Sequence, residues 1–313
     1  MTEPRIAIGP SSPEFVEDAV RTGGGVPVKT DEEADGLVWL SYHNNMGGRD
    51  GTDDLSEVLS RQRGIRWVQF PFAGVEEVVA SGVIDADHIW TCAKGVYAEP
   101  VAEHALALAL AGLRCMPERV QARSWGAPAG TSLYGERVTI LGGGGITEEL
   151  LRLLAPFGVQ ATVVRRKQEP LEGAASTVGI DRLDEALGGA LVVFLALALT
   201  PATTGIIGEK QFAAMDERAW LVNVARGRHV DTDALVAALR EGAIAGVATD
   251  VTDPEPLPDG HPLWDMSNCI ITPHTADTWD MVQPRLSARI SENVSRFASG
   301  RTLIGLIDTE QGY

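Results

Sequence analysis

Between residues 137 and 272 the sequence alternates short apolar runs with longer amphipathic stretches, a pattern that few folds accommodate. The runs are Arg137–Leu141, Gln160–Val164, Leu191–Leu197, Trp220–Asn223, Ile244–Thr249 and Cys269–Thr272. Such runs predict parallel strands, because parallel neighbours need a crossover that a helix usually supplies. The sequence therefore predicts an α/β domain with a doubly wound parallel sheet.

The first hundred residues show a second alternation of the same kind. The expected strands there are Arg5–Ile8, Gly36–Leu40, Trp67–Phe70 and Ile89–Cys92. We expect a long connecting helix over residues 97–123 and a further helix over residues 278–299, with the residues after about 285 returning to pack on the first domain. A length of 313 residues fits two domains of roughly 150 residues each. We thus predict one domain of residues 1–98 plus 286–313 and another of residues 99–285.

The composition limits the kinds of molecule that the protein can bind and the compartment in which it is expected. A net charge of −17 excludes a general affinity for nucleic acid or for an anionic membrane, because both need a basic surface. The N-terminal MTEPRIAIGP lacks the pattern of a signal peptide, and the apolar run at 190–199 is too short to cross a bilayer. Cys92, Cys115 and Cys269 are widely spaced, which predicts reduced thiols and neither a zinc site nor a disulfide framework. We expect a cytoplasmic protein without a metal.

A glycine-rich turn, ILGGGGITEELL, follows the first strand of the second domain. In a dinucleotide-binding fold the first glycine makes the tight turn and the second lets the backbone approach the pyrophosphate. Gly142 and Gly144 fill these roles, and Gly145 and Ile146, which precede the helix expected over residues 147–155, are also assigned to the cofactor site. Thr147 occupies the third glycine position, where its hydroxyl could cap the helix. Taken alone, the motif is equally compatible with a dinucleotide site and with a glycine-rich turn that binds no ligand.

The end of the next strand indicates which dinucleotide is bound. Arg165, which lies 23 residues after Gly142, occupies the window where an acidic residue would bind the ribose 2′-hydroxyl of NAD. An arginine there matches a 2′-phosphate through its planar fork, and Arg166 follows it. A solvated basic face is the alternative. We predict NADP as the preferred cofactor, with NAD possible.

Polar residues follow the last three strands of the second domain. Arg226 comes after the first of these strands, Asp250 and Glu255 after the second, and His274 after the third. Doubly wound sheets carry their chemistry at the carboxyl ends of strands, so these side chains are expected around one crevice. A guanidinium would bind and polarise a 2-keto acid, while an imidazolium held by a carboxylate would donate a proton. The set predicts hydride transfer to a 2-keto acid.

On these motifs, the sequence resembles the D-isomer-specific 2-hydroxyacid dehydrogenase family, with glyoxylate/hydroxypyruvate reductases as the nearest type. Residues 226 and 255 are 29 apart and residues 255 and 274 are 19 apart, as in the family's order of ARG, PEP and PH motifs. The matching segments are FAGVEEV, YAEPVAEHALALALA, ILGGGG, LTPATTGIIG, VNVARGRHVDTDAL, TDVTDPEPLPDGHPLW and TPHTADTW.

The resemblance implies roles for particular residues. It makes Arg226, Glu255 and His274 the catalytic trio. It also implies that backbone amides of Ala73 and Gly74 help to hold the substrate carboxylate. The residues implied for the cofactor, beyond the glycine turn and the two arginines, are Thr200, Pro201, Val224 and Asp250, the last through the nicotinamide carboxamide.

The resemblance further implies a flavodoxin-like substrate domain and a Rossmann-type dinucleotide-binding domain with a cleft between them. It also implies a homodimer formed partly through residues 98–125.

Two alternative functions remain open at this point. One is a dinucleotide-sensing protein of the co-repressor type; the other is a phosphoglycerate, phosphite or formate dehydrogenase of the same family.

Four further features have weaker interpretations. His104 lies within an apolar helix and is expected to be a core histidine, while His229 is expected at the surface or in a loop. Residues 42–45 could shape the substrate pocket or form an ordinary polar loop. Trp279 could line a pocket or a subunit contact.

Overall fold

The structure, a computed structural model, describes residues 3–40 and 52–308. Its contacts divide the chain into two compact units: unit 1 contains residues 1–97 and 278–313, and unit 2 contains residues 98–277. The expected boundary at 285/286 falls inside helix α10 (Trp279–Ala298), which packs against α1 (Glu14–Thr22). The division by contacts places residues 278–285 with unit 1.

Unit 1 contains a parallel sheet with the strand order β2-β1-β3-β4-β5. Its strands are β1 (Arg5–Gly9), β2 (Val26–Lys29), β3 (Gly36–Trp39), β4 (Trp67–Gln69) and β5 (Ile89–Thr91). This is the flavodoxin-like order that we expected. The sequence missed β2, an edge strand whose residues are at most half-buried and which contains Pro27. Edge strands tolerate proline because one side of the strand needs no partner.

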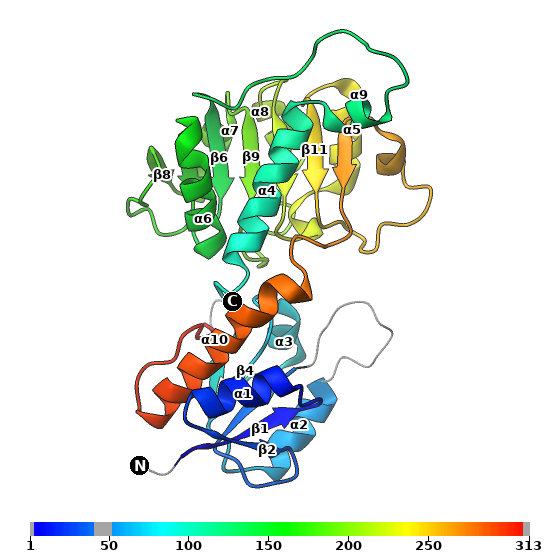
Figure 1. The fold of residues 1–313 in the computed structure, drawn as a ribbon. Coiled ribbons are helices and arrows are strands. Elements are labelled where there is room, and N and C mark those ends of the chain that lie inside the picture. The colour runs from blue at the N-terminus through cyan, green and yellow to red at the C-terminus, as the bar shows by residue number, and fades with distance from the viewer. Residues whose placement is uncertain (1–2, 41–51, 309–313) are drawn as a thin grey trace. The chain divides into compact units, whose positions relative to one another are not determined.

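Helices cover both faces of this sheet (Figure 1). Side chains alternate along β3, so that Val38 joins a core with α1 and α10 while Leu37 and Trp39 join a core on the opposite face. The opposite face is covered by α2 (Thr52–Arg61) and α3 (Glu76–Ser81).

Unit 2 contains a parallel sheet with the order β12-β11-β10-β9-β6-β7-β8. Its strands are β6 (Arg137–Leu141), β7 (Gln160–Val164), β8 (Ser176–Val178), β9 (Val192–Leu195), β10 (Trp220–Asn223), β11 (Gly246–Thr249) and β12 (Cys269–Ile271). Six of these strands were predicted, and β8 was missed because two of its three residues are the polar Ser176 and Thr177 and only Val178 is buried. The chain crosses from β8 back past β6 to β9, which is the strand-order reversal of the Rossmann type.

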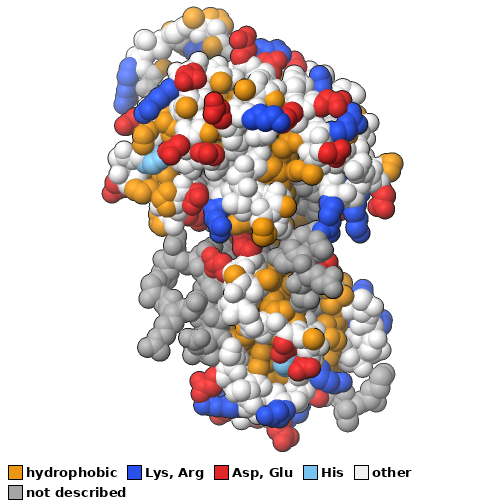
Figure 2. Space-filling model, turned by 180° about the vertical axis from the view of Figure 1, so that it is seen from behind, with side chains coloured by type: hydrophobic (Ala, Val, Ile, Leu, Met, Phe, Trp, Pro, Cys, Tyr) orange, Lys and Arg blue, Asp and Glu red, His pale blue; other side chains and the backbone are white. Residues whose placement is uncertain are grey.

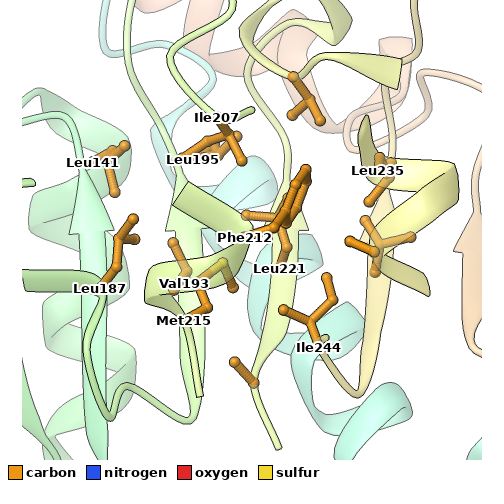
Figure 3. Packing of buried hydrophobic residues seen from close by; sticks show 14 of the residues in the cluster. Leu141, Leu187, Val193, Leu195, Ile207, Phe212, Met215, Leu221, Leu235 and Ile244 are labelled. Carbon is orange, nitrogen blue, oxygen red and sulfur yellow. The ribbon is translucent and has the colours of Figure 1, made fainter. Parts of the chain in front are cut away.

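Two layers of helices enclose the sheet of unit 2. On one face α4 (Ala98–Leu113) packs on α6 (Gly145–Leu154) and on strands β10 and β11 (Figure 1). The other face carries α7 (Leu183–Leu187), α8 (Glu209–Ala214) and α9 (Thr232–Glu241). Figure 3 shows Leu187, Phe212 and Leu235 from these helices packing on strand residues such as Leu195 and Leu221. Burial of this apolar surface is the main stabilisation of the unit.

The expected helix over residues 97–123 is two helices. α4 ends at Leu113 and α5 spans Met116–Gln121. Between them Cys115 has a φ of 51°, a left-handed conformation that stops a helix. The 3-10 helices of the described chain are Ala155–Phe157, Ile180–Arg182, Gly227–His229 and Pro262–Asp265.

Charged side chains are spread over the surface drawn in Figure 2, and the described helices lack the length or the apolar character of a membrane-spanning helix. Acidic and basic side chains are interspersed on the face drawn in Figure 2. Among residues 3–40 and 52–308, every helix is too short or too polar to traverse a lipid bilayer.

Candidate active site

The glycine turn between β6 and α6 is tightly packed at Gly142 and open at Gly144. Gly142 has a φ of 121°, and a Cβ there would lie 2.1 Å from the Ala196 carbonyl oxygen, so only glycine fits. Gly144 differs, because its φ is −98° and a Cβ added there would meet no described atom within 4 Å. The helix starts at Gly145, followed by Ile146, so its first N–H groups have no partner within the helix. The turn thus has the form of an anion site at a helix start.

Thr147 packs inside the unit and does not cap the helix. Its side chain is fully buried, and its hydroxyl has no hydrogen-bond partner in the described structure. Gly144 occupies the N-cap position, so the expectation of a capping threonine is wrong. Position 147 lies where helix and sheet meet, and the threonine fills that space with its methyl group at the cost of an unpaired hydroxyl.

Arg165 lies directly over the glycine turn. It follows β7, and a Cβ added to Gly143 would lie 2.4 Å from its Cδ atom. Its Nη2 donates to the Glu169 carbonyl oxygen at 3.1 Å. Its Nε is buried and has no acceptor among the described residues, whereas the neighbouring Arg166 is exposed. A buried unpaired donor on a guanidinium is the type of group that an anion would satisfy.

The loop after β10 holds Arg226 in place. The Asn223 side chain accepts from the Ala225 N–H at 3.0 Å and donates to the Arg226 carbonyl oxygen at 3.0 Å. A Cβ on Gly227 would lie 2.0 Å from the backbone of Thr252, so this loop packs directly on the loop that carries Glu255. The Arg226 guanidinium donates to the Ala225 carbonyl oxygen at 2.7 Å through Nη1.

His274 and Glu255 form a hydrogen-bonded pair from two neighbouring loops. His274 Nδ1 lies 2.7 Å from Glu255 Oε1, and the two side chains are 33% and 29% exposed. The hydrogen bond with Glu255 raises the pKa of His274, and this effect outweighs burial and the positive charge of Arg226, which both lower it. His274 therefore stays protonated to a higher pH than an ordinary histidine.

The carboxylate of the pair is shifted in the opposite direction. Burial alone would raise the pKa of Glu255. The hydrogen bond from His274 and the charges of His274 and Arg226 outweigh burial, so the pKa of Glu255 is lowered. An ionised carboxylate beside a protonated imidazole, within the field of a guanidinium, is an arrangement suited to proton transfer.

Asp250 organises the loop that carries His274. It is 2% exposed and its Oδ1 accepts from the Thr272 hydroxyl at 2.5 Å and from the Thr275 N–H at 2.9 Å. Oδ2 accepts from the Ala276 N–H at 2.9 Å. Burial would raise the pKa of Asp250, but the hydrogen bonds outweigh it and the pKa is lowered. His274 itself has a φ of 49°, a left-handed conformation that this network stabilises.

The other expected cofactor residues lie at the carboxyl edge of the same sheet. Thr200 and Pro201 begin a turn after β9, in which the Thr200 carbonyl oxygen accepts from the N–H groups of Thr203 and Thr204 at 3.0 Å. Val224 is buried directly after β10. Their contacts to a cofactor stay predictions, as does that of Asp250 to the nicotinamide.

Ala73 and Gly74 belong to unit 1, between β4 and α3. Their role in substrate binding stays a prediction. The residues at 42–45 lie outside the described part of the chain. Trp279 makes an edge-on contact with Phe15, with ring centroids 5.3 Å apart, and is 42% exposed.

Three polar residues that the sequence assigned no role support these loops. His229 is fully buried rather than at the surface, with Nδ1 2.9 Å from the Thr203 carbonyl oxygen and Nε2 3.2 Å from the Leu197 carbonyl oxygen. It joins the turn after β9 to the turn after β10. Asn223 and Thr272 act within the loops that carry Arg226 and His274. Their only sequence signal is their position beside the motifs.

Comparison with known proteins assigns the family. Residues 104–276 match the model of the D-isomer specific 2-hydroxyacid dehydrogenase, NAD binding domain. The chain is 39% identical over 255 residues to the "Uncharacterized protein in proB 3'region" of Corynebacterium melassecola, which covers 80% of this chain and 84% of that protein. It is 34% identical over 209 residues to the human glyoxylate reductase/hydroxypyruvate reductase, which covers 64% of this chain and 63% of that protein.

A solved structure extends the similarity to both units. The D-isomer specific 2-hydroxyacid dehydrogenase of Xanthobacter autotrophicus Py2, solved in complex with NADPH and MES, is 27% identical, with a TM-score of 0.83 over 100% of both chains. The resemblance inferred from the motifs and the expected fold class are both confirmed. Because the matched segment makes up more than half of the sequence, the chain belongs to the D-isomer-specific 2-hydroxyacid dehydrogenase family of NAD(P)-dependent oxidoreductases.

Proposed function

We propose that this protein is an NADP(H)-preferring reductase of small 2-keto acids, with glyoxylate and hydroxypyruvate as the first candidate substrates. The observation that carries the proposal is the His274–Glu255 pair at 2.7 Å, within the field of Arg226. The similarity to the human glyoxylate reductase/hydroxypyruvate reductase supports the choice of substrates.

Each residue of the trio has a separate task in the proposed reaction. Arg226 binds the substrate carboxylate and polarises the ketone through its two-pronged guanidinium. Glu255 holds Nδ1 of His274, which leaves Nε2 to donate its proton to the oxygen of the ketone. NADPH, when bound, would supply the hydride for the carbonyl carbon. His274 ends the reaction neutral and regains its proton from solvent.

The described residues fit NADP(H) at two points. The open space beside Gly144 and the N–H groups at the start of α6 suit a pyrophosphate, with Gly142, Gly144 and Gly145 supplying backbone only. The buried, unpaired Nε of Arg165 over the same turn suits a 2′-phosphate. NADPH is bound in the Xanthobacter relative, which supports the same assignment here.

Parallel assays with the two reduced nucleotides test this proposal. The purified protein is given NADPH or NADH and a panel of 2-keto acids that includes glyoxylate, hydroxypyruvate and pyruvate. Turnover with NADPH at a lower KM than with NADH supports the proposal. Turnover with NADH alone refutes the cofactor preference, and nucleotide binding without any turnover favours a dinucleotide-sensing protein.

Arg165 provides a sharper test of the cofactor. Arg165→Asp is expected to reverse the preference, raising the KM for NADPH at least about tenfold and lowering the KM for NADH, since a carboxylate repels a phosphate and accepts from a 2′-hydroxyl. Arg182→Asp, at an exposed arginine paired with Glu185, is the matched control. Equal losses with both nucleotides would remove the 2′-phosphate role.

We further propose a homodimer and a cytoplasmic location. Met116, Val120 and Trp125 are 48%, 75% and 99% exposed, an apolar group that a second copy of this chain would cover. The three cysteines are free thiols, which suits a reducing compartment.

A further inference from the structure

His104 is connected to the catalytic loop rather than enclosed in an apolar core. It lies on α4, and its side chain is 22% exposed. Its Nε2 is 3.1 Å from the Thr272 hydroxyl and 3.5 Å from Asp250 Oδ1. These groups could not be connected from the sequence, because 168 residues separate His104 from Thr272.

A count of protons fixes the direction of this contact. The ionised Asp250 only accepts, so the single hydroxyl proton of Thr272 is donated to Oδ1 in the 2.5 Å hydrogen bond. Towards His104 the same hydroxyl oxygen can then only accept. The Nε2 atom of His104 must therefore carry a hydrogen, which it donates to Thr272 while lying close to Oδ1.

The chain of contacts ends at the backbone beside His274. Asp250 accepts from the N–H groups of Thr275 and Ala276, the two residues that follow His274. At the other end, α4 is anchored by its packing on α6, β10 and β11. His104 thus joins a fixed helix to the loop that carries the proposed acid.

We propose that His104 is a positioning residue of the reaction, whose Nε2–H group acts through Thr272 and Asp250 to fix the loop that presents His274. This inference rests on the proposed reductase function. His104 touches neither of the proposed reacting groups, so its contribution is to the placement of His274. Misplacement of a catalytic group by a fraction of an ångström lowers kcat more than it lowers ground-state binding.

The test compares two substitutions of His104. His104→Leu keeps apolar volume and removes the donor, and is expected to lower kcat about tenfold with the KM for the keto acid within about twofold. His104→Gln restores an amide N–H at a similar distance from the backbone, and is expected to recover kcat to within about threefold of wild type. Leu106→Ala, at a half-buried position on the same helix, is the control for a loss of stability alone.

A double substitution tests the proposed route. Thr272→Val removes the hydroxyl while keeping the shape, so His104→Leu combined with Thr272→Val should be no slower than the slower single variant. Independent, multiplied losses overturn the route through Thr272. An unchanged kcat in His104→Leu, or a failure of His104→Gln to recover it, overturns the positioning role.

The two proposals fail in different ways. If the wild-type protein reduces no keto acid, the proposed function is refuted before any variant is compared. If the wild type reduces a keto acid and His104→Leu has the same kcat, the proposed function stands and the role of His104 is refuted. The same conclusion follows if the loss of kcat in His104→Leu is no larger than the loss in Leu106→Ala.

Discussion

Removal of the charge on Glu255 should move the pH range of the reaction. Glu255→Gln keeps a hydrogen-bond acceptor near Nδ1 of His274 but removes the carboxylate that raises the pKa of the imidazole. The pKa of His274 should then fall. Ketone reduction needs the imidazolium, so its alkaline limb should shift to lower pH. Oxidation of the hydroxy acid needs the neutral imidazole, so its acid limb should shift in the same direction and extend that activity to lower pH.

The size of the shift follows from the geometry of the pair. Two unit charges about 4 Å apart interact by ~1 kcal/mol in bulk water and by ~4 kcal/mol at an effective dielectric constant of 20. The two side chains are 33% and 29% exposed, which places the interaction in the lower part of that range, at about 1.4 kcal/mol. This corresponds to about one pH unit. At a pH above both pKa values, keto acid reduction should fall about tenfold.

The assay measures kcat for reduction and for oxidation from pH 5 to 9 in wild type and Glu255→Gln. Asp259→Asn, which alters an exposed carboxylate on the same loop, is the control for a change in net charge. Near pH 5 the two proteins should reduce the keto acid at rates within a few-fold of each other. A loss of the same size at every pH, with neither limb displaced, would refute the reasoning.

Three further substitutions test the structure at other points. Gly144→Ala should leave the melting temperature unchanged, since the φ of −98° at this position suits any residue and no described atom lies within 4 Å of the added Cβ. The added methyl group should weaken NADPH binding at least about tenfold in a fluorescence titration. A variant with wild-type affinity for NADPH would contradict the placement of the pyrophosphate. Thr147→Val removes the buried unpaired hydroxyl and should raise the free energy of unfolding by about 1 kcal/mol in urea denaturation, whereas a destabilised variant would indicate an unseen partner for that hydroxyl. Trp125→Ser should shift the protein from dimer to monomer in light scattering without changing its circular dichroism; a wild-type monomer, or a variant that remains dimeric, would exclude this residue from the interface.

Strands that form an apolar run could be predicted from the sequence, including the three-residue edge strands β5 and β12, whereas β2 and β8 lack such a run and could not. β6, β9 and β10 are almost entirely buried, so each appears as an apolar run. β2 contains Pro27 and Lys29, and β8 begins with Ser176 and Thr177, so the composition of both resembles that of a loop. Such a strand is specified by the neighbour that it pairs with, which a local pattern does not contain.

The same distinction applies to the candidate site. The positions of Arg226 and His274 after their strands are local signals, and the structure places both at the carboxyl edge of one sheet. The polar links that hold the loops in place join distant parts of the chain. His104 reaches Thr272 across 168 residues, and the buried His229 reaches Leu197 across 32. Neither link could be predicted, because a single histidine among apolar residues has the same appearance whether or not it has a polar partner.

The assembly of unit 1 from both ends of the chain has a consequence for biosynthesis. Helix α10 supplies Val282, Leu286, Ile290 and Val294 to the core that it shares with α1. A ribosome releases these residues only after all of unit 2, residues 98–277, has been made. Unit 2 can therefore fold while the earlier-made strands of unit 1 still lack the helix that covers them. The nascent protein should expose that apolar face until residues 279–298 have left the ribosome, so unit 1 can be completed only after unit 2 has been made.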